Sequence, residues 1–194
     1  TGARARASVA IRRVHHGRMP RQHQRSHLER AHRVIVYKSA KYSIEAPLVI
    51  GAALAGATRE QIEVLRRFGL PLGIAYQLRD DLLGVFGDPT VTGKPAGDDL
   101  REGKRTVLIA IARTLLATSS RRLLDELLGD EDLTAQQVVM VQASIEESGA
   151  VERVERIIDH NVGLALEALR DAPLSRASKD QLIELAQTVT RRTF

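Results

Sequence analysis

The sequence predicts an all-α protein folded as an antiparallel helical bundle, and three features support this prediction. Long stretches are rich in Ala, Leu, Glu and Arg, which favour helices over strands. Helix start and stop signals recur along the chain and leave only short loops between them. Aromatic residues make up only 3% of the 194 residues, so the core must be built from aliphatic side chains. This length is sufficient for one domain with a sizeable core.

Residues 1–27 differ in composition from the rest of the chain. Arginine, histidine and glutamine dominate there with almost no apolar periodicity, so the segment cannot bury enough surface to offset the entropy of ordering. We expect it to be disordered or to be translated out of frame at the start of a truncated gene. An out-of-frame stretch of GC-rich DNA would also encode many arginines. A nucleic-acid-binding arm or a histidine metal site is less favoured, because the segment has no aromatic residue and no recognisable motif.

Residues 28–194 form the second predicted unit, and their helices follow from local signals. A first helix is predicted over about 28–45, Pro47 allows a second segment to begin, and Gly56 ends it. Thr58 and Gln61 form a capping-box pattern that opens a long helix ending near residue 86. After a loop to about residue 97, further helices are predicted over 100–116, 121–128, 135–148, 150–170 and from Ser178 to about Arg191.

Acidic residues, lysines and glycines converge at only one stretch, residues 76–106. Asp80 and Asp81 lie near the end of the long helix, where Gln77 and Asp81 share one helical stripe. Two adjacent carboxylates repel each other unless a hard cation lies beside them, and Mg²⁺ commonly bridges carboxylates to phosphate. Lys94 and Lys104 follow in a glycine-rich segment and supply ammonium groups that bind phosphate. The stretch therefore predicts a site for a magnesium diphosphate.

These residues resemble motifs of the trans-isoprenyl diphosphate synthases, also called polyprenyl synthetases, and most resemble the geranylgeranyl diphosphate synthase branch. Residues 76–84 are similar to the family's second aspartate-rich motif, usually Phe-Gln-x-x-Asp-Asp-x-x-Asp. Residues 93–104 resemble its Gly-Lys...Gly-x-Asp...Lys segment, and residues 37–42 its Lys-Thr motif, with Ser39 keeping the hydroxyl. The resemblance covers roughly Leu28 to the C-terminus and implies an isoprenoid-synthase-type helical bundle.

The resemblance also implies roles for individual residues. The expected metal ligands are Asp80, Asp81 and Asp99. The expected catalytic residues are Lys38, Lys94, Lys104 and Gln77. The expected substrate-binding residues are Lys38, Ser39, Tyr76, Lys94 and Lys104.

The implied activity is that of a prenyltransferase, which condenses isopentenyl diphosphate with an allylic diphosphate head to tail. Its implied cofactor is Mg²⁺, and the family is expected to be homodimeric. No nucleic-acid partner is expected. No apolar run reaches the roughly 20 residues of a membrane span, and the start of the sequence lacks a signal-peptide pattern, so we expect a cytoplasmic protein. The absence of cysteine excludes disulfides and thiolate metal sites.

The sequence departs from the family pattern in two places. Gly84 replaces the last aspartate of the motif, so that contact falls to Asp88 or to water. The family's first aspartate-rich motif should precede Lys38 and is absent, which predicts an incomplete bundle lacking its N-terminal helices and inactive alone. The alternative is a catalytically silent remnant or a partner subunit of an intact homologue. The missing partner is expected to expose the apolar side chains of Ile44, Leu48, Ile74 and Ile111.

Overall fold

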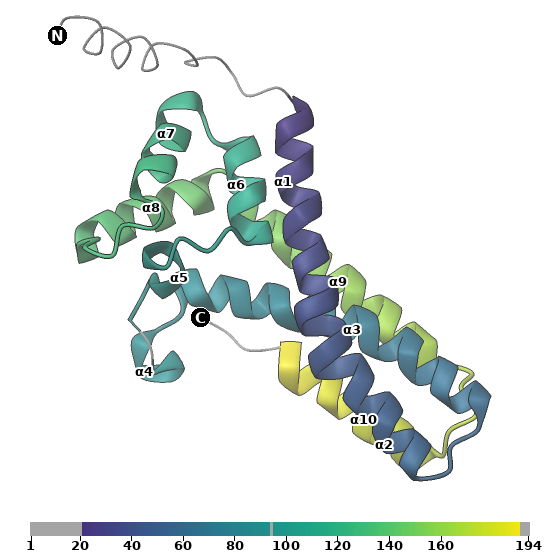
Figure 1. Ribbon diagram of the computed structural model, residues 1–194. Helices are drawn as coiled ribbons and strands as arrows, with labels where there is room; N and C mark the ends of the chain where they lie inside the picture. Colours follow the sequence, from purple (N-terminus) through teal and green to yellow (C-terminus); the bar gives the residue numbers. More distant parts are fainter. Residues whose placement is uncertain (1–20, 94, 191–194) are drawn as a thin grey trace, which may run out of the picture.

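The computed structural model describes residues 21–93 and 95–190, and all regular structure within them is helical, as predicted (Figure 1). The elements in chain order are α1 (Arg21–Val34), the π-helix η2 (Ile35–Glu45), α2 (Ala46–Leu54), α3 (Arg59–Phe86), α4 (Pro89–Thr92), α5 (Asp98–Arg101), α6 (Val107–Leu115), α7 (Thr118–Leu127), α8 (Ala135–Glu147), α9 (Ala150–Leu169) and α10 (Arg176–Thr190). Within this described part, no helix combines the length and the apolarity needed to span a bilayer.

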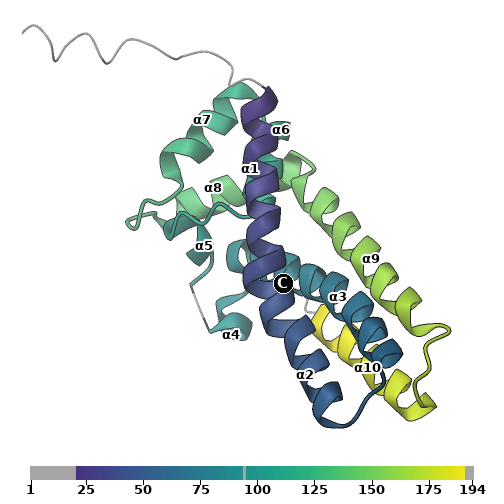
Figure 2. The same cartoon turned by 45° about the vertical axis from the view of Figure 1, so that its right-hand side comes forward.

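The α3 helix is the centre of the fold. It packs along η2 on one side and along α9 on another, and it also contacts α2, α5, α6 and α10. In Figures 1 and 2, α1, η2 and α2 follow one another as a single rod that crosses α3. The helices α6, α7 and α8 gather near the α1 end of this rod, whereas α10 lies near its α2 end (Figure 1).

Local signals place most helix boundaries where the sequence predicts them. Thr58 and Gln61 form the predicted capping box at the start of α3, and Thr134 forms an equivalent box with Gln137 at the start of α8. Gly56 and Gly149 both have φ 77°, a left-handed conformation that favours glycine and separates consecutive helices. The α3 helix continues through Pro71.

Three helix starts differ from the prediction. The α1 helix begins at Arg21, so residues 21–27 of the segment predicted to be disordered or out of frame are helical. Residues 1–20 lie outside the described residues, and the prediction for them stays a prediction. The helix predicted from residue 100 begins only at Val107, because residues 98–101 form a separate turn and the Thr106 hydroxyl accepts from the Ile109 amide to cap α6. The last helix, α10, begins at Arg176.

The core consists of two apolar clusters along α3, mostly aliphatic apart from the buried Phe68 in the smaller one. The larger one surrounds the second half of α3 with α6, α8 and the first half of α9, and residues 107–112 of α6 are all buried. The smaller one joins the first half of α3 to the second half of α9 and to α10. The apolar sequence of residues 107–112 predicts such a helix, buried on every side.

The predicted exposure of four apolar residues is wrong, because none of them is exposed. Ile74 and Ile111 are buried, because both pack within the larger cluster. Ile44 and Leu48 are half-buried against the smaller one. The large apolar side chains that are exposed on the rod are instead Val34, Tyr37, Tyr42, Ile50 and Leu54. The rod thus carries an unpartnered apolar surface, at positions other than those predicted.

Candidate functional site

The acidic end of α3 is organised by one glutamine. Gln77 Nε2 donates to Asp80 Oδ2 at 3.2 Å and to Asp81 Oδ1 at 2.9 Å, so a single amide bridges both carboxylates. These contacts follow from helical spacing, since residues three and four positions apart lie on the same face. Asp80 is exposed, whereas Asp81 is only 6% exposed. The sequence-predicted association of Gln77 with the aspartate pair is therefore present in the structure.

Asp81 has the most perturbed acidity of the site. The pKa of Asp81 is raised to about 7, chiefly by burial; the Gln77 hydrogen bond lowers it in part, and the nearby charges of Asp99 and Asp80 also raise it. Burial also raises the pKa of Asp99, with the Asp80 charge acting in the same direction. The three carboxylates thus share one electrostatic environment, although Asp99 belongs to a different element. Perturbed acids of this kind concentrate at functional sites.

Lys104 supplies the positive charge beside Asp80, Asp81 and Asp99, which together form the acidic cluster. Its Nζ atom lies 2.5 Å from Asp99 Oδ1 and 2.9 Å from Glu102 Oε2, and its side chain is 42% exposed. Burial alone would lower the pKa of Lys104, but the hydrogen bonds to Asp99 and Glu102 outweigh it and raise the pKa. The ammonium group is therefore held beside the carboxylates and is still accessible to an anion from solvent.

Gly84 faces this cluster from α3. A Cβ built on Gly84 would overlap the carboxyl group of Asp99, so the two residues are in direct contact. Asp88, which the sequence indicates as a replacement for the missing motif aspartate, begins the next helix. Its carboxylate accepts from the backbone amide and the hydroxyl of Thr90, both at 2.7 Å, and caps α4.

The residues resembling the Lys-Thr motif lie in η2, a π-helix. Runs of π-helix are rare in proteins and are frequent at functional sites. Lys38 is exposed and Ser39 is half-buried. The η2 backbone approaches α3 very closely, because a Cβ on Gly73 would overlap Ala40. Glycine at this position of α3 thus allows the motif-bearing helix to pack directly against the helix that bears the aspartates.

Two further residues support the acidic end of α3, and the motif pattern does not reveal them. Arg79 makes a bidentate ion pair with Glu155 of α9 at 2.5 and 2.7 Å, and its Nε atom donates to the Thr190 carbonyl of α10 at 3.0 Å. Gln142 of α8 donates to the Val85 carbonyl at 2.6 Å, near the end of α3. The sequence signals these contacts only by a charged residue, Arg79, in the largely apolar second half of α3. The partners of Arg79 lie far away along the chain.

The structure brings together Gln77, Asp80, Asp81, Asp99 and Lys104. Tyr76 is half-buried on α3 next to Gln77, and Lys38 and Ser39 lie on the adjacent η2. Lys94 lies outside the described residues. The catalytic, substrate-binding and metal-binding roles of all these residues stay predictions.

The donor set suits Mg²⁺ shared with a ligand better than a closed protein site. Among the described residues, no group of three His, Cys, Asp or Glu side chains is arranged to hold a metal ion by itself. Mg²⁺ usually keeps several waters and takes one or two carboxylates plus substrate phosphates. Carboxylates of Asp80, Asp81 and Asp99 next to an ammonium group fit that mode of binding.

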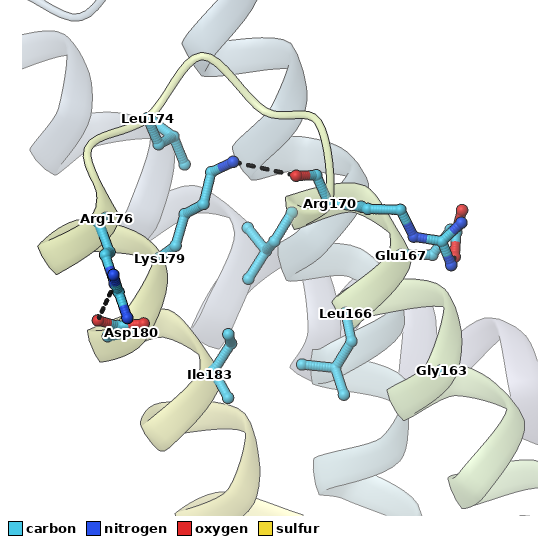
Figure 3. A pocket seen from close by; sticks show the side chains of 10 residues that line it. Gly163, Leu166, Glu167, Arg170, Leu174, Arg176, Lys179, Asp180 and Ile183 are labelled. Atoms are coloured by element: carbon cyan, nitrogen blue, oxygen red, sulfur yellow. Dashed lines mark hydrogen bonds and ion pairs between the residues drawn. The ribbon is translucent and has the colours of Figure 1, made fainter.

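Two large cavities lie away from the carboxylates. One, of about 660 Å³, lies between the end of α9 and α10 (Figure 3). Its charged groups are largely paired among themselves, since Lys179 donates to the Arg170 carbonyl at 3.1 Å and Arg176 lies near Asp180 (Figure 3). The other, of about 790 Å³, is lined by η2, α3 and α9. Neither is lined by a member of the acidic cluster.

Comparison with known proteins agrees with the motifs. The model of the polyprenyl synthetase family matches residues 10–145, a range that begins earlier than the predicted start of similarity at Leu28. Among curated relatives, geranylfarnesyl diphosphate synthase of Aeropyrum pernix is 38% identical over 73% of this chain and 43% of its own length. Geranylgeranyl diphosphate synthase of Mycobacterium tuberculosis is 36% identical over 74% and 40%. The chain therefore spans less than half the length of these relatives.

Solved structures give the same result for the fold. Geranylgeranyl pyrophosphate synthase of Corynebacterium glutamicum, complexed with isoprenyl diphosphate and magnesium, matches with a TM-score of 0.82 and 38% identity. The match covers 89% of this chain and 50% of that one, which agrees with a bundle that is incomplete by comparison. The synthetase of Pyrococcus horikoshii matches with a TM-score of 0.74 and 27% identity. Motifs, fold and the family match over residues 10–145 together show that this chain belongs to the polyprenyl synthetase family.

Proposed function

We propose that this chain carries the diphosphate-binding half of a prenyltransferase site, which joins isopentenyl diphosphate to an allylic diphosphate. The observation that carries the proposal is the cluster of Asp80, Asp81 and Asp99 around Gln77 and Lys104. The Lys104 ammonium group pairs with Asp99 and Glu102, and Asp80 and Asp81 add their carboxylates beside Asp99, so the cluster has a surplus of negative charge next to a phosphate-binding cation. That balance fits a ligand consisting of Mg²⁺ and diphosphate.

The chemistry needs charge to be withdrawn onto a leaving diphosphate. Bound Mg²⁺ neutralises part of that charge, which diphosphate requires to leave an allylic carbon. Lys104 is held beside Asp99 and adds a point charge to the same phosphate, as Lys38 and Lys94 are proposed to do. Gln77 keeps Asp80 and Asp81 in one orientation through its two hydrogen bonds. Their positions therefore do not depend on the arrival of the ligand.

The proposed substrates, the Mg²⁺ requirement and a homodimeric assembly come from the family. Because the chain spans 40–50% of its relatives, the carboxylates of a facing helix are not among its motifs. We propose that the 194-residue chain alone binds diphosphate but does not condense the two substrates. Ionisation requires the leaving group to be held from both sides, and one-sided binding does not provide that geometry.

Isothermal titration calorimetry with inorganic diphosphate tests this proposal directly. The chain should bind diphosphate in the presence of MgCl₂ and much more weakly in EDTA. Asp80→Asn should weaken the magnesium-dependent binding by about tenfold, the usual effect of losing one charge-assisted contact. Asp159→Asn is the matched control, because Asp159 is an exposed acid of α9 outside the cluster. Equal binding with and without Mg²⁺ would refute the proposal.

A second candidate function is that of a non-catalytic partner for an intact homologue. The half-length match and the exposed apolar side chains of the rod favour it. The two candidates differ in a condensation assay with isopentenyl and allylic diphosphates. Turnover by the purified chain that disappears in Asp80→Ala would contradict both candidates, because it would show that the chain alone condenses the two substrates. The partner role would be supported if the chain shows no turnover by itself but changes the turnover rate of an intact homologue that is added to it.

A further inference from the structure

The carboxyl group of Asp99 lies where a side chain on residue 84 would otherwise be. A Cβ built on Gly84 would overlap the Asp99 carboxyl carbon and both of its oxygens. The α3 backbone is ordinary helix at this position, and Gly84 is not among the glycines with positive φ. Glycine is therefore not required by the backbone conformation. The contact with Asp99 is the structural reason for the missing side chain.

The position of Asp99 is fixed by the surrounding core. Its neighbour Leu100 is 1% exposed and belongs to the larger aliphatic cluster. Arg101 donates to the Ala96 carbonyl at 2.7 Å and to the Leu133 carbonyl at 3.2 Å, which holds the loop on either side. Asp99 itself is 7% exposed. A buried short helix therefore presents the carboxylate to α3.

Position 84 is also where the family pattern places the third aspartate of the motif. We propose that Asp99 supplies this third acidic group from α5, and that Gly84 is needed because it leaves room for it. The inference rests on the proposed function and assigns Gly84 the role of a positioning residue. Asp88, the alternative that the sequence indicates, uses its Oδ1 atom to cap α4 through Thr90.

Gly84 and Asp99 then act as one unit, and different substitutions at position 84 have different consequences. An alanine displaces the Asp99 carboxylate and puts no acid in its place. An aspartate displaces it too, but brings its own carboxylate to the site. Removal of the Asp99 charge should therefore matter when residue 84 is glycine and matter little when it is aspartate.

The first test measures binding of inorganic diphosphate in MgCl₂ by calorimetry with the 194-residue chain. Asp99→Asn should lower the affinity about tenfold, as expected for one charge-assisted contact. Gly84→Ala should lower it by a similar factor, although it removes no charged group. Gly84→Asp should stay within about threefold of the wild type, and adding Asp99→Asn to it should cost less than about another threefold.

The second test is thermal unfolding without any ligand. Alanine normally stabilises a helix interior relative to glycine. Gly84→Ala should nevertheless lower Tm in the wild type, where the Asp99 carboxylate must move, and raise it in Asp99→Ala, where the space is free. Gly51→Ala in α2 is the matched control and should raise Tm in both backgrounds, because a Cβ there meets nothing within 4 Å.

Three results of these comparisons would overturn the inference, and two others separate it from the proposed function. One is a Gly84→Ala variant that binds diphosphate as tightly as the wild type. Another is a loss of affinity on Asp99→Asn that is as large in the Gly84→Asp background as in the wild type. The third is a rise in Tm for Gly84→Ala in the wild type. Lack of magnesium-dependent diphosphate binding by the wild type would refute the proposed function and this inference together. Intact wild-type binding that Asp99→Asn leaves unchanged would refute this inference alone.

Discussion

Replacing Asp81 with asparagine should stabilise the protein above neutral pH. The Asp81 carboxylate is 6% exposed and accepts a hydrogen bond from Gln77 at 2.9 Å. An asparagine side chain has almost the same size, and its amide oxygen can accept the same hydrogen bond. The substitution thus removes the charge and leaves the packing in place. It also removes a proposed metal ligand, so the gain in stability should accompany a loss of magnesium-dependent diphosphate binding.

The magnitude follows from the acidity of the group. Burial raises the pKa of Asp81 from its ordinary value of 3.8 to about 7. Each unit corresponds to about 1.36 kcal/mol, so the charged carboxylate costs at most about 4 kcal/mol at about pH 8. Relaxation and water entry reduce such penalties, and we expect a measured gain of about 1–3 kcal/mol.

The sign of the pH dependence is fixed by the direction of the shift. The folded protein binds the Asp81 proton more tightly than the unfolded chain, because the pKa is raised on folding. The contribution of this group to stability therefore falls as pH rises from 3.8 towards 7, and the penalty is complete above that range. The advantage of Asp81→Asn should be less than half as large near pH 5 as near pH 8.

Urea unfolding followed by circular dichroism, at about pH 5 and about pH 8 in EDTA, measures this difference. Asp80→Asn is the matched control, since Asp80 is exposed on the same turn and should change stability by less than about 0.5 kcal/mol. The reasoning would be refuted by an Asp81→Asn variant that is less stable than the wild type near pH 8. An advantage that does not grow with pH would refute it too.

Three further outcomes are expected. Arg79→Met should cost about 2–4 kcal/mol in urea unfolding, because it leaves Glu155 without its bidentate partner, whereas loss of the exposed Arg176 pair should cost less than about 0.5 kcal/mol. Gly73→Ala should destabilise by about 1–3 kcal/mol, because its Cβ overlaps the η2 backbone; stability at or above that of the wild type would contradict this packing. The isolated chain should self-associate in sedimentation velocity, and Leu54→Glu should weaken the association, since Leu54 is 86% exposed.

Features that depend on neighbouring residues could be predicted from the sequence. The capping boxes at Thr58 and Thr134 and the contacts of Gln77 with Asp80 and Asp81 arise within one turn of helix. The local sequence patterns are therefore sufficient to predict these contacts. The all-α class follows in the same way from composition and spacing.

Features that depend on distant residues could not be predicted. The late start of α6 reflects the turn after Asp99, where Gly103 approaches Gly129 closely. The partners of Arg79, which are Glu155 and the Thr190 carbonyl, come from helices later in the chain. The contact of Asp99 with Gly84 requires knowledge of how α5 packs on α3. None of these pairings leaves a local pattern.

Burial has opposite effects on stability in the acidic cluster and in the rest of the fold. Along most of α3 the inward residues are aliphatic and complete two cores, so burial stabilises the helix. At its acidic end, burial raises the pKa of Asp81 and of Asp99, so the same packing opposes their ionisation. Lys104 and Gln77 offset only part of that cost. A site that retains buried carboxylates at the expense of stability agrees with the proposed function, in which a Mg²⁺ ion lies beside them and offsets their charge.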